Sequence, residues 1–288
     1  MKKFYKLNRL WLEFNTLTTG YFMKLGFYFC FALLGLFGNE VLLEEKRIVI
    51  VVPSYKNEKW VKQNLSSIFN QDYVNYRVIY IDDYSPDNTV PLIKSLVNEW
   101  NFAVNFTLIE NKERKGAMRN LYEAIHSCDD EEIVVTVDGD DWLAHDQVLN
   151  HLNKVYSNKD RPVWITHGSY RDSKGNPGMQ NQITDSIIER NAFRGKCRVS
   201  HLRTFYAWLF KKILIQDLMY EGKFFEMAWD LAMMFPMLEM AGHRQLYIPE
   251  VLYIYNVQNP ISDFVKNPDY QMKLDRYIHK KRKYCPLL

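Results

Sequence analysis

The sequence predicts an α/β fold with a mostly parallel, Rossmann-like central sheet flanked by helices and a more helical C-terminal half. Two observations support this fold. From Arg47 to about residue 170, short β-branched runs alternate with longer amphipathic stretches, an order that builds parallel sheets. Polar motifs also follow successive strands, where open parallel sheets bind their ligands. The 288 residues suffice for one large or two small domains.

The first predicted strand is the apolar run 48–52, whose unbroken hydrophobicity is typical of a strand buried on both faces. Later strands are predicted by β-branched and aromatic runs, and helices by apolar residues at helical spacing. The other strands of the first half are expected at 76–81, 104–109, 133–137 and 163–166. The helices between them are expected at 58–69, 90–100, 117–127 and 147–155.

The pattern weakens after about Gly168. Residues 175–178 read Gly-Asn-Pro-Gly, a turn cluster, and the polar stretch as far as Arg198 is predicted to be a flexible segment. Beyond it we expect regular elements again. These are amphipathic helices at 205–216, 225–241 and 270–283, and a strand at 252–255.

The first 44 residues form a basic and apolar segment unlike the rest of the chain. The apolar run 25–37 is short for a bilayer span of about 20 residues, but the longer range 21–43 reaches that length. We predict a signal-anchor, or a secretory signal peptide if Met23 is the true start; a packed amphipathic helix is the alternative. Either targeting route implies a membrane-associated or secretory location, and the alternative a cytoplasmic one.

Charge and cysteine content exclude several classes of protein. The formal net charge of +3 is too balanced to imply nucleic acid as a partner without a focused basic patch. The four cysteines include no Cys-x-x-Cys pair, which disfavours zinc binding, redox chemistry and a dense disulfide framework. We therefore expect buried thiols.

Polar residues follow the first and second predicted strands. Pro53 ends the first strand, and Tyr55 and Glu58 are among the residues that open the next helix. The second strand runs into Asp82 and Asp83, whose carboxylates can accept hydrogen bonds from a pyrimidine N–H and a ribose hydroxyl. A capped turn before the following helix is the alternative explanation for this acidic pair.

A basic and an acidic motif follow the third and fourth strands. Residues 111–120 place Arg119 one turn inside a helix, where a cation can face a diphosphate or a base carbonyl. The fourth strand ends in Asp138, Asp140 and Asp141, whose mutual repulsion a divalent cation would offset. Carboxylate ligands favour Mg²⁺ or Mn²⁺, and a solvated acidic turn is the alternative.

The ordered motifs PSYKNE, IDDYSPDNT, KGAMRN and VDGDDW resemble the nucleotide-sugar domain of glycosyltransferase family 2, which has the GT-A fold. The resemblance covers about residues 47–170, and four motifs in order are a strong signal although each alone is modest. It implies an inverting enzyme that binds its nucleotide sugar through residues 45–170. Residues 171–288 would then bind the acceptor and supply the catalytic base.

The resemblance also implies roles for single residues. Donor binding falls to Pro53, Tyr55, Glu58, Asp82, Asp83, Arg119 and Asp138. Of these, Asp82 or Asp83 would meet the base, Arg119 the base or phosphates, and Asp138 the ribose or sugar. The metal would be held by Asp140, with Asp141 as a second ligand.

The second half contains a candidate catalytic base. The family places its base in a Glu-Asp pair at the start of a late helix, and the matching position here reads Trp229-Asp230. We predict Asp230 as the base, within a largely apolar helix, with Glu226 one turn earlier as the competitor. His201 is a candidate third metal ligand or a structural histidine, and Arg203 a candidate acceptor-side or phosphate-facing residue.

Together these features predict a divalent-metal-dependent transferase that moves a single sugar from a nucleotide sugar, with a UDP-sugar favoured, to a glycan, lipid or protein hydroxyl. Processive synthases of the family carry a Gln-x-x-Arg-Trp motif, which this sequence lacks. A sugar-phosphate nucleotidyltransferase would show a glycine-rich basic loop where residues 53–58 stand. The other alternative is a non-catalytic nucleotide-sugar or glycan binder, against which the acidic motif and Asp230 argue.

Overall fold

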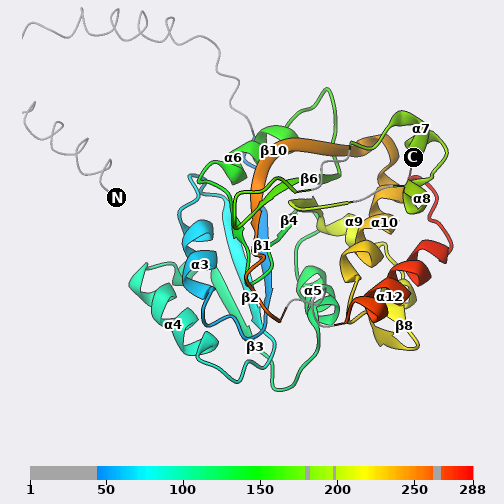
Figure 1. The fold of residues 1–288 in the computed structure, drawn as a ribbon. Helices are drawn as coiled ribbons and strands as arrows, with labels where there is room; N and C mark the ends of the chain where they lie inside the picture. The colour runs from blue at the N-terminus through cyan, green and yellow to red at the C-terminus, as the bar shows by residue number, and fades with distance from the viewer. Residues whose placement is uncertain (1–43, 179–181, 197–198, 262–266, 288) are drawn as a thin grey trace, which may run out of the picture. The chain divides into compact units, whose positions relative to one another are not determined.

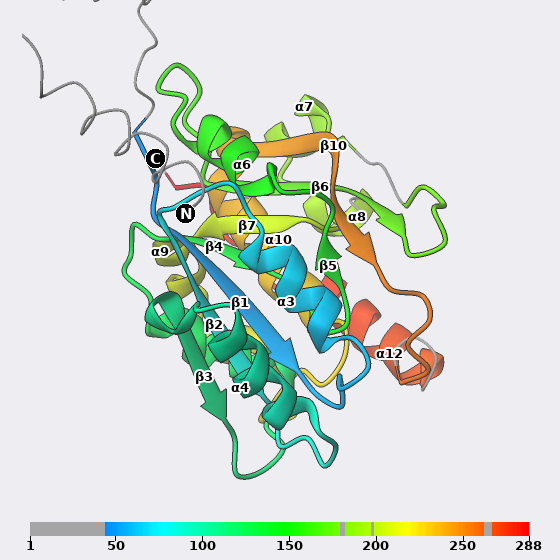
Figure 2. The same cartoon turned by 90° about the vertical axis from the view of Figure 1, so that its left-hand side faces the viewer.

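The computed structural model describes residues 44–178, 182–196, 199–261 and 267–287. They form an eight-stranded, mostly parallel sheet with helices on both faces, as the sequence predicts (Figure 1, Figure 2). The predicted targeting segment lies outside the described residues, apart from Glu44 at its end. In the parts of the chain that the structure describes, no helix has the length and apolar character needed to cross a membrane.

The first half alternates strand and helix as expected. Its strands are β1 (Ile48–Ser54), β2 (Tyr76–Asp82), β3 (Phe106–Glu110), β4 (Ile133–Thr136) and the short β5 (Trp142–Leu143). Its helices are α3 (Val61–Phe69), α4 (Thr89–Glu99), the 3-10 turn η1 (Ala103–Asn105), α5 (Ala117–His126) and α6 (Val148–Tyr156). β1 pairs in parallel with β2 and β4, and β2 with β3, so the carboxyl ends of four strands meet at one edge.

The second half extends the same sheet beyond residue 170. The predicted boundary between two functional halves at that residue stays a prediction. Its strands are β6 (Ile165–Asp172), β7 (Arg203–Tyr206), β8 (Met219–Tyr220), β9 (Lys223–Phe224) and β10 (Gln245–Tyr255). Its helices are α7 (Asp185–Glu189), α8 (Phe193–Lys196), α9 (Ala207–Lys211), α10 (Trp229–Ala241) and α12 (Pro268–Lys280), with 3-10 turns η2 (Ile215–Leu218) and η3 (Gly242–Arg244).

The strand order in the large sheet is β3-β2-β1-β4-β7-β6-β10-β5. β6 and β10 are parallel, whereas β7 runs antiparallel to both β4 and β6, and β5 runs antiparallel to β10. The sheet is therefore mixed rather than wholly parallel. β8 and β9 form a separate hairpin just before α10.

Two predictions for the second half are wrong. The stretch 205–216 is not one helix, because Phe205 lies in β7 and pairs with Val134 of β4 and Ile165 of β6. Its apolar run satisfies strand and helix patterns equally, and the neighbouring strands decide the outcome. The stretch 168–198 is not a loop throughout, since β6 continues into it and α7 and α8 follow.

Two hydrophobic cores lie on opposite faces of the sheet. Val49 and Val51 of β1 belong to the core covered by α5, α9, α10 and α12, whereas Ile48, Ile50 and Val52 belong to the core covered by α3, α4 and α6 (Figure 1). β1 is buried along its whole length because both faces are covered. This double burial explains why its sequence is an unbroken apolar run.

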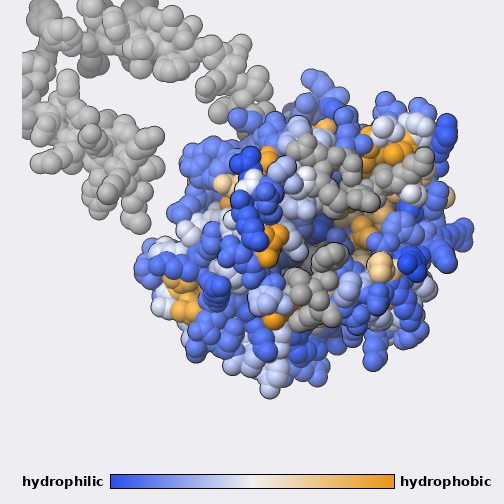
Figure 3. All heavy atoms as spheres, in the orientation of Figure 1, coloured by the Kyte–Doolittle hydropathy of each residue, from blue (hydrophilic) through white to orange (hydrophobic). Residues whose placement is uncertain are grey.

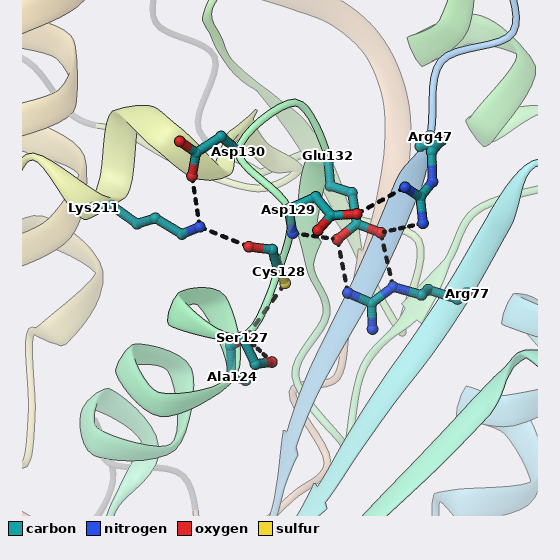
Figure 4. Close-up of polar contacts among 9 residues, drawn as sticks. All are labelled: Arg47, Arg77, Ala124, Ser127, Cys128, Asp129, Asp130, Glu132 and Lys211. Atoms are coloured by element: carbon teal, nitrogen blue, oxygen red, sulfur yellow. Dashed lines mark hydrogen bonds and ion pairs between the residues drawn. The ribbon is translucent and has the colours of Figure 1, made fainter.

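A partly buried ion pair ties the amino ends of the central strands together, at the edge opposite the polar motifs. Glu132, just before β4, is 1% exposed and accepts hydrogen bonds of 2.8 and 2.7 Å from Arg77 of β2 (Figure 4). Arg47, just before β1, lies 3.6 Å from the same carboxylate. Burial acts to raise the pKa of Glu132, but the bonds and charge of Arg77 outweigh it and lower the pKa.

Removing this carboxylate should weaken the whole sheet. Glu132→Ala should lower the free energy of unfolding by about 2 kcal/mol, because it removes two charge-assisted hydrogen bonds from the partly exposed Arg77. Urea unfolding followed by circular dichroism measures this, with the exposed neighbour Glu131→Ala as the control. Since the folded pKa of Glu132 is lowered, its stabilisation is lost as the pH falls through that pKa, so the two variants should converge in acid. Equal stability at neutral pH would contradict the expectation.

Candidate active site

A pocket of about 300 Å³ lies at the carboxyl ends of β1, β2 and β4. The loops after these strands form one wall, and the start of α10, the end of β10 and α12 form the other. Figure 3 shows this side of the molecule as mainly hydrophilic, with apolar residues in small patches. The pocket brings together nine residues predicted from the sequence. They are Pro53, Tyr55, Asp83, Asp138, Asp140, Asp141, His201, Arg203 and Asp230.

Asp83 organises the loop between β3 and α5. Its carboxylate accepts hydrogen bonds from the side chains of Asn111 and Arg114, both at 2.9 Å, and from the backbone N–H groups of Lys115 and Gly116, at 2.8 and 2.9 Å. Burial acts to raise the pKa of Asp83, but these hydrogen bonds lower it overall. Both oxygens are thus engaged by the protein, and a contact with a base stays a prediction.

Arg114 is a pocket residue that the sequence analysis missed. Its guanidinium carbon lies 3.3 Å from the centroid of the Tyr55 ring, while Nε donates to Asp83. Arg119, predicted for this role, lies outside the pocket and pairs with Glu123 on the exposed side of α5 at 2.8 Å. Both arginines belong to one basic motif, and only the path of the loop shows which of them faces the pocket.

Glu58 and Asp82 support the loops and do not line the pocket. The carboxylate of Glu58 accepts hydrogen bonds from the backbone and side chain of Asn88, both at 3.1 Å. Asp82 accepts one from the Ser85 backbone N–H at 3.0 Å. These bonds close the turn between β2 and α4. Asp82 therefore holds the turn through Ser85, without capping α4, whereas Asp83 reaches the pocket.

Asp141 is the most deeply buried carboxylate of the acidic motif. It accepts hydrogen bonds from the Tyr253 hydroxyl at 2.7 Å and from the Asn256 backbone N–H at 2.6 Å. Burial raises the pKa of Asp141 well above its usual value, and the charges of Asp140 and Asp138 raise it further. Three close acids are thus unfavourable in their ionised forms, which a bound cation would relieve.

Asp138, Asp141 and His201 form a candidate metal centre. One ligand atom from each lies within 4.8 Å of the others, close enough for small side-chain rotations to bring all three onto one ion. His201 Nδ1 is buried and has no hydrogen-bond partner among the described residues. Burial, followed by the charge of Arg203, lowers the pKa of His201 well below its usual value. The ring is therefore neutral, the form that binds metals.

Asp140 lies outside this group of three, although the sequence suggested it as a ligand beside Asp141. Its carboxylate accepts a hydrogen bond from the Asn259 side chain at 2.7 Å, and burial raises its pKa. Residues after β10 thus hold two of the three acids, since Asn256 contacts Asp141 and Asn259 contacts Asp140. No local sequence motif could have indicated these contacts.

Asp230 lies on the opposite wall, in the first turn of α10. The helix begins after Ala228, whose φ of 54° is left-handed, and so starts later than predicted. Asp230 is consequently not buried within the helix: its side chain is 29% exposed and accepts a hydrogen bond from Arg203 Nη2 at 2.9 Å. The competing candidate Glu226 is exposed and does not line the pocket.

Fold and site together define a GT-A type protein, and solved structures share this fold. TarS of Staphylococcus aureus, in complex with UDP-GlcNAc, superposes with a TM-score of 0.60 at 18% identity, over 81% of this chain and 65% of that one. The mannosyltransferase PcManGT of Pyrobaculum calidifontis, in complex with GDP-Man and Mn²⁺, gives 0.50 at 19% identity, over 88% and 68%.

The sequence comparison identifies the family. The profile described as glycosyl transferase family 2 matches residues 49–219, more than half of the chain, and the chain belongs to this family. An uncharacterized glycosyltransferase of Haemophilus influenzae is 29% identical over 131 residues, 45% of this chain and 50% of that protein. Glycosyltransferase GlyA of Streptococcus pneumoniae is 23% identical over 230 residues, 75% and 31%. The chain spans half or less of the length of these relatives.

The buried acids should make the metal-free protein pH-sensitive. Because the folded pKa of Asp141 is raised, the folded state binds this proton more tightly, and stability falls as the pH rises through that pKa. With a chelator present, Asp141→Asn should remove this slope and stabilise the protein by about 1 kcal/mol at about pH 8. Urea unfolding between about pH 5 and pH 8 tests this. The exposed Asp146→Asn is the control, and an unchanged slope in Asp141→Asn would refute the assignment.

Proposed function

We propose that this protein is an inverting, divalent-metal-dependent glycosyltransferase that moves one sugar from a nucleotide sugar to an acceptor hydroxyl. One observation carries the proposal: the Asp138, Asp141 and His201 cluster and the carboxylate of Asp230 line the same pocket from different elements. In-line displacement at a sugar carbon needs charge stabilisation at the leaving group and a base at the attacking hydroxyl. The two groups supply these two requirements.

The donor would bind along the loops after β1 and β3. The stacked pair of Tyr55 and Arg114 supplies a flat surface and a cation for the base and phosphates, and Asp83 holds Arg114 in place. TarS and PcManGT were solved with UDP-GlcNAc and GDP-Man, which supports a nucleotide-sugar donor here. We favour a UDP-sugar, because the superposition on TarS has the higher TM-score.

Mg²⁺ or Mn²⁺ would be held by Asp138, Asp141 and His201. Carboxylate oxygens and a neutral imidazole suit Mn²⁺, and the unpartnered His201 Nδ1 and the raised pKa of Asp141 both fit a cation-binding site. When bound, the ion would supply positive charge to offset the departing diphosphate. Asp140, held by Asn259, would shape the floor of the pocket.

Asp230 would accept the proton of the acceptor hydroxyl. Its position in the first turn of α10 leaves it partly exposed to the pocket, and Arg203 holds its carboxylate in one orientation. A general base must lie within hydrogen-bonding reach of the proton that it removes, and a fixed carboxylate at a pocket wall meets that condition for an incoming hydroxyl. The acceptor would approach past α10 and the start of α12, where Gln271 lines the pocket.

Replacement of the two arginines of the basic motif distinguishes the pocket residue from the surface residue. Arg114→Ala should weaken binding of UDP by at least about tenfold, because it removes a charged group from the stacked pair. Arg119→Ala should change binding by less than about twofold, since a surface ion pair contributes little. Isothermal titration calorimetry with UDP and GDP measures both. A larger loss in Arg119→Ala would restore the role that the sequence suggested.

Replacement of the base should separate chemistry from binding. Asp230→Asn should reduce transfer by about 10²- to 10⁴-fold while donor binding is retained, because only proton removal is lost. The measurement is product formation from a panel of nucleotide sugars and acceptors, with and without Mn²⁺, and Glu226→Gln is the matched control outside the pocket.

Metal-dependent turnover of one donor would identify the sugar. Donor binding without turnover on any acceptor would instead favour a non-catalytic binder. Full activity of Asp230→Asn would exclude this residue as the base.

A further inference from the structure

Arg203 connects the candidate metal centre to the candidate base through a single nitrogen. Its Nη2 lies 2.9 Å from Oδ2 of Asp230 and 3.1 Å from Nε2 of His201. The side chain is buried at the first position of β7, with 6% of its surface exposed. The two hydrogens of Nη2 are thus shared between a residue of the metal centre and the base.

The hydrogen bond to His201 defines the tautomer of the ring. A guanidinium can only donate, so Nε2 must be the accepting nitrogen and the proton of the neutral ring lies on Nδ1. Nδ1 is buried without a partner among the described residues, which is costly for an N–H group. The metal-free arrangement therefore satisfies one ring nitrogen of His201 and leaves the other unsatisfied.

Metal binding by His201 cannot coexist with this hydrogen bond. A neutral imidazole has one nitrogen with a free lone pair. If Nε2 binds the ion, its lone pair is no longer available to Arg203. If Nδ1 binds the ion, the proton moves to Nε2, which then cannot accept. Either way, the bond from Arg203 to His201 must break.

The surroundings of His201 indicate which side chain moves. The imidazole stacks on Tyr253 at a centroid distance of 4.3 Å and an interplanar angle of 10°, and the ring of Tyr170 lies perpendicular to it at a centroid distance of 5.9 Å. The ring is thus held between aromatic side chains. Arg203, by contrast, has a second partner to which it can turn, because its Nη2 already donates to Asp230.

We propose that Arg203 is a positioning residue that competes with the metal ion for His201 and is released to Asp230 when the ion binds. The proposal rests on the metal dependence proposed above. Binding of the ion would then be coupled to the positioning of Asp230 by Arg203. In the metal-free protein, Arg203 is divided between two partners. When the ion binds His201, the guanidinium of Arg203 donates hydrogen bonds to Asp230 alone.

Metal affinity tests this competition without any activity measurement. In the full chain, Arg203→Met should bind Mn²⁺ at least about tenfold more tightly than the wild type, because a competing donor and a positive charge are both removed. Free Mn²⁺ measured by electron paramagnetic resonance gives the affinity. Arg114→Met removes one pocket charge that does not contact His201, and its gain should be no more than about threefold.

A double variant separates competition from simple charge repulsion. In a His201→Phe background, which keeps the ring stacked on Tyr253 but removes the lone pair, Arg203→Met should gain no more affinity than Arg114→Met does. A gain that persists at full size in this background would overturn the proposal, because repulsion alone would then explain it. An unchanged Mn²⁺ affinity in Arg203→Met, together with Mn²⁺-dependent transfer by the wild type, would also overturn it and leave the proposed function standing.

The wild-type protein offers a test that does not depend on a variant folding. Titration of protein labelled with ¹⁵N in both histidine and arginine with the diamagnetic ion Cd²⁺ should shift the Nε2 resonance of His201 and the side-chain N–H signals of Arg203 together. Saturation with both sets of signals unchanged would overturn the coupling. Failure of Mn²⁺ and Cd²⁺ to bind at all would overturn the coupling and the proposed metal dependence together.

Discussion

The site depends on keeping three carboxylates close together at the buried end of β4. Burial and mutual repulsion both disfavour the ionised forms, and this is why the pKa of Asp141 is raised so far. The protein reduces the cost with donors from β10 and the loop that follows it, where Tyr253 and Asn256 contact Asp141 and Asn259 contacts Asp140. The remaining repulsion among the ionised acids lowers the stability of the fold, and a bound cation would reduce it.

The mixed topology of the sheet places residues of the second half at the pocket. β7 is inserted antiparallel between β4 and β6, and its first residue, Arg203, therefore lies at the same edge as the carboxyl end of β4. The pairing of Thr136 with Arg203 fixes this neighbourhood through backbone hydrogen bonds. A wholly parallel sheet would have put the start of this strand at the opposite edge, away from the acidic motif.

The buried carboxylates at the two edges of the sheet differ in their effect on stability. At the amino ends, Glu132 is satisfied by Arg77 and has a lowered pKa, so its charge stabilises the fold. At the carboxyl ends, both oxygens of Asp141 accept hydrogen bonds, yet burial and the charges of Asp140 and Asp138 raise its pKa. Glu132 and Asp141 are thus similarly buried, but the pKa of Glu132 is lowered and that of Asp141 is raised. The unfavourable carboxylate is the one that lies in the pocket, as expected for residues that serve binding rather than stability.

The sequence by itself determined the α/β class, the strands and helices of the first half, and several of the residues that line the pocket. These features are local: an apolar run that ends in a polar motif carries both the strand and the residues at its end. The place of Tyr55, Asp83 and Asp138 at this edge of the sheet could be predicted for this reason before the fold was known.

Only the tertiary structure decided the rest. Local pattern does not separate Arg114 from Arg119, because the path of a loop determines which of them covers Tyr55. It also does not reveal β7, since an apolar run becomes a strand there only by pairing with β4 and β6. The contact of Arg203 with Asp230 joins residues 27 positions apart on different elements. Such contacts depend on long-range packing, which no local spacing of residues encodes.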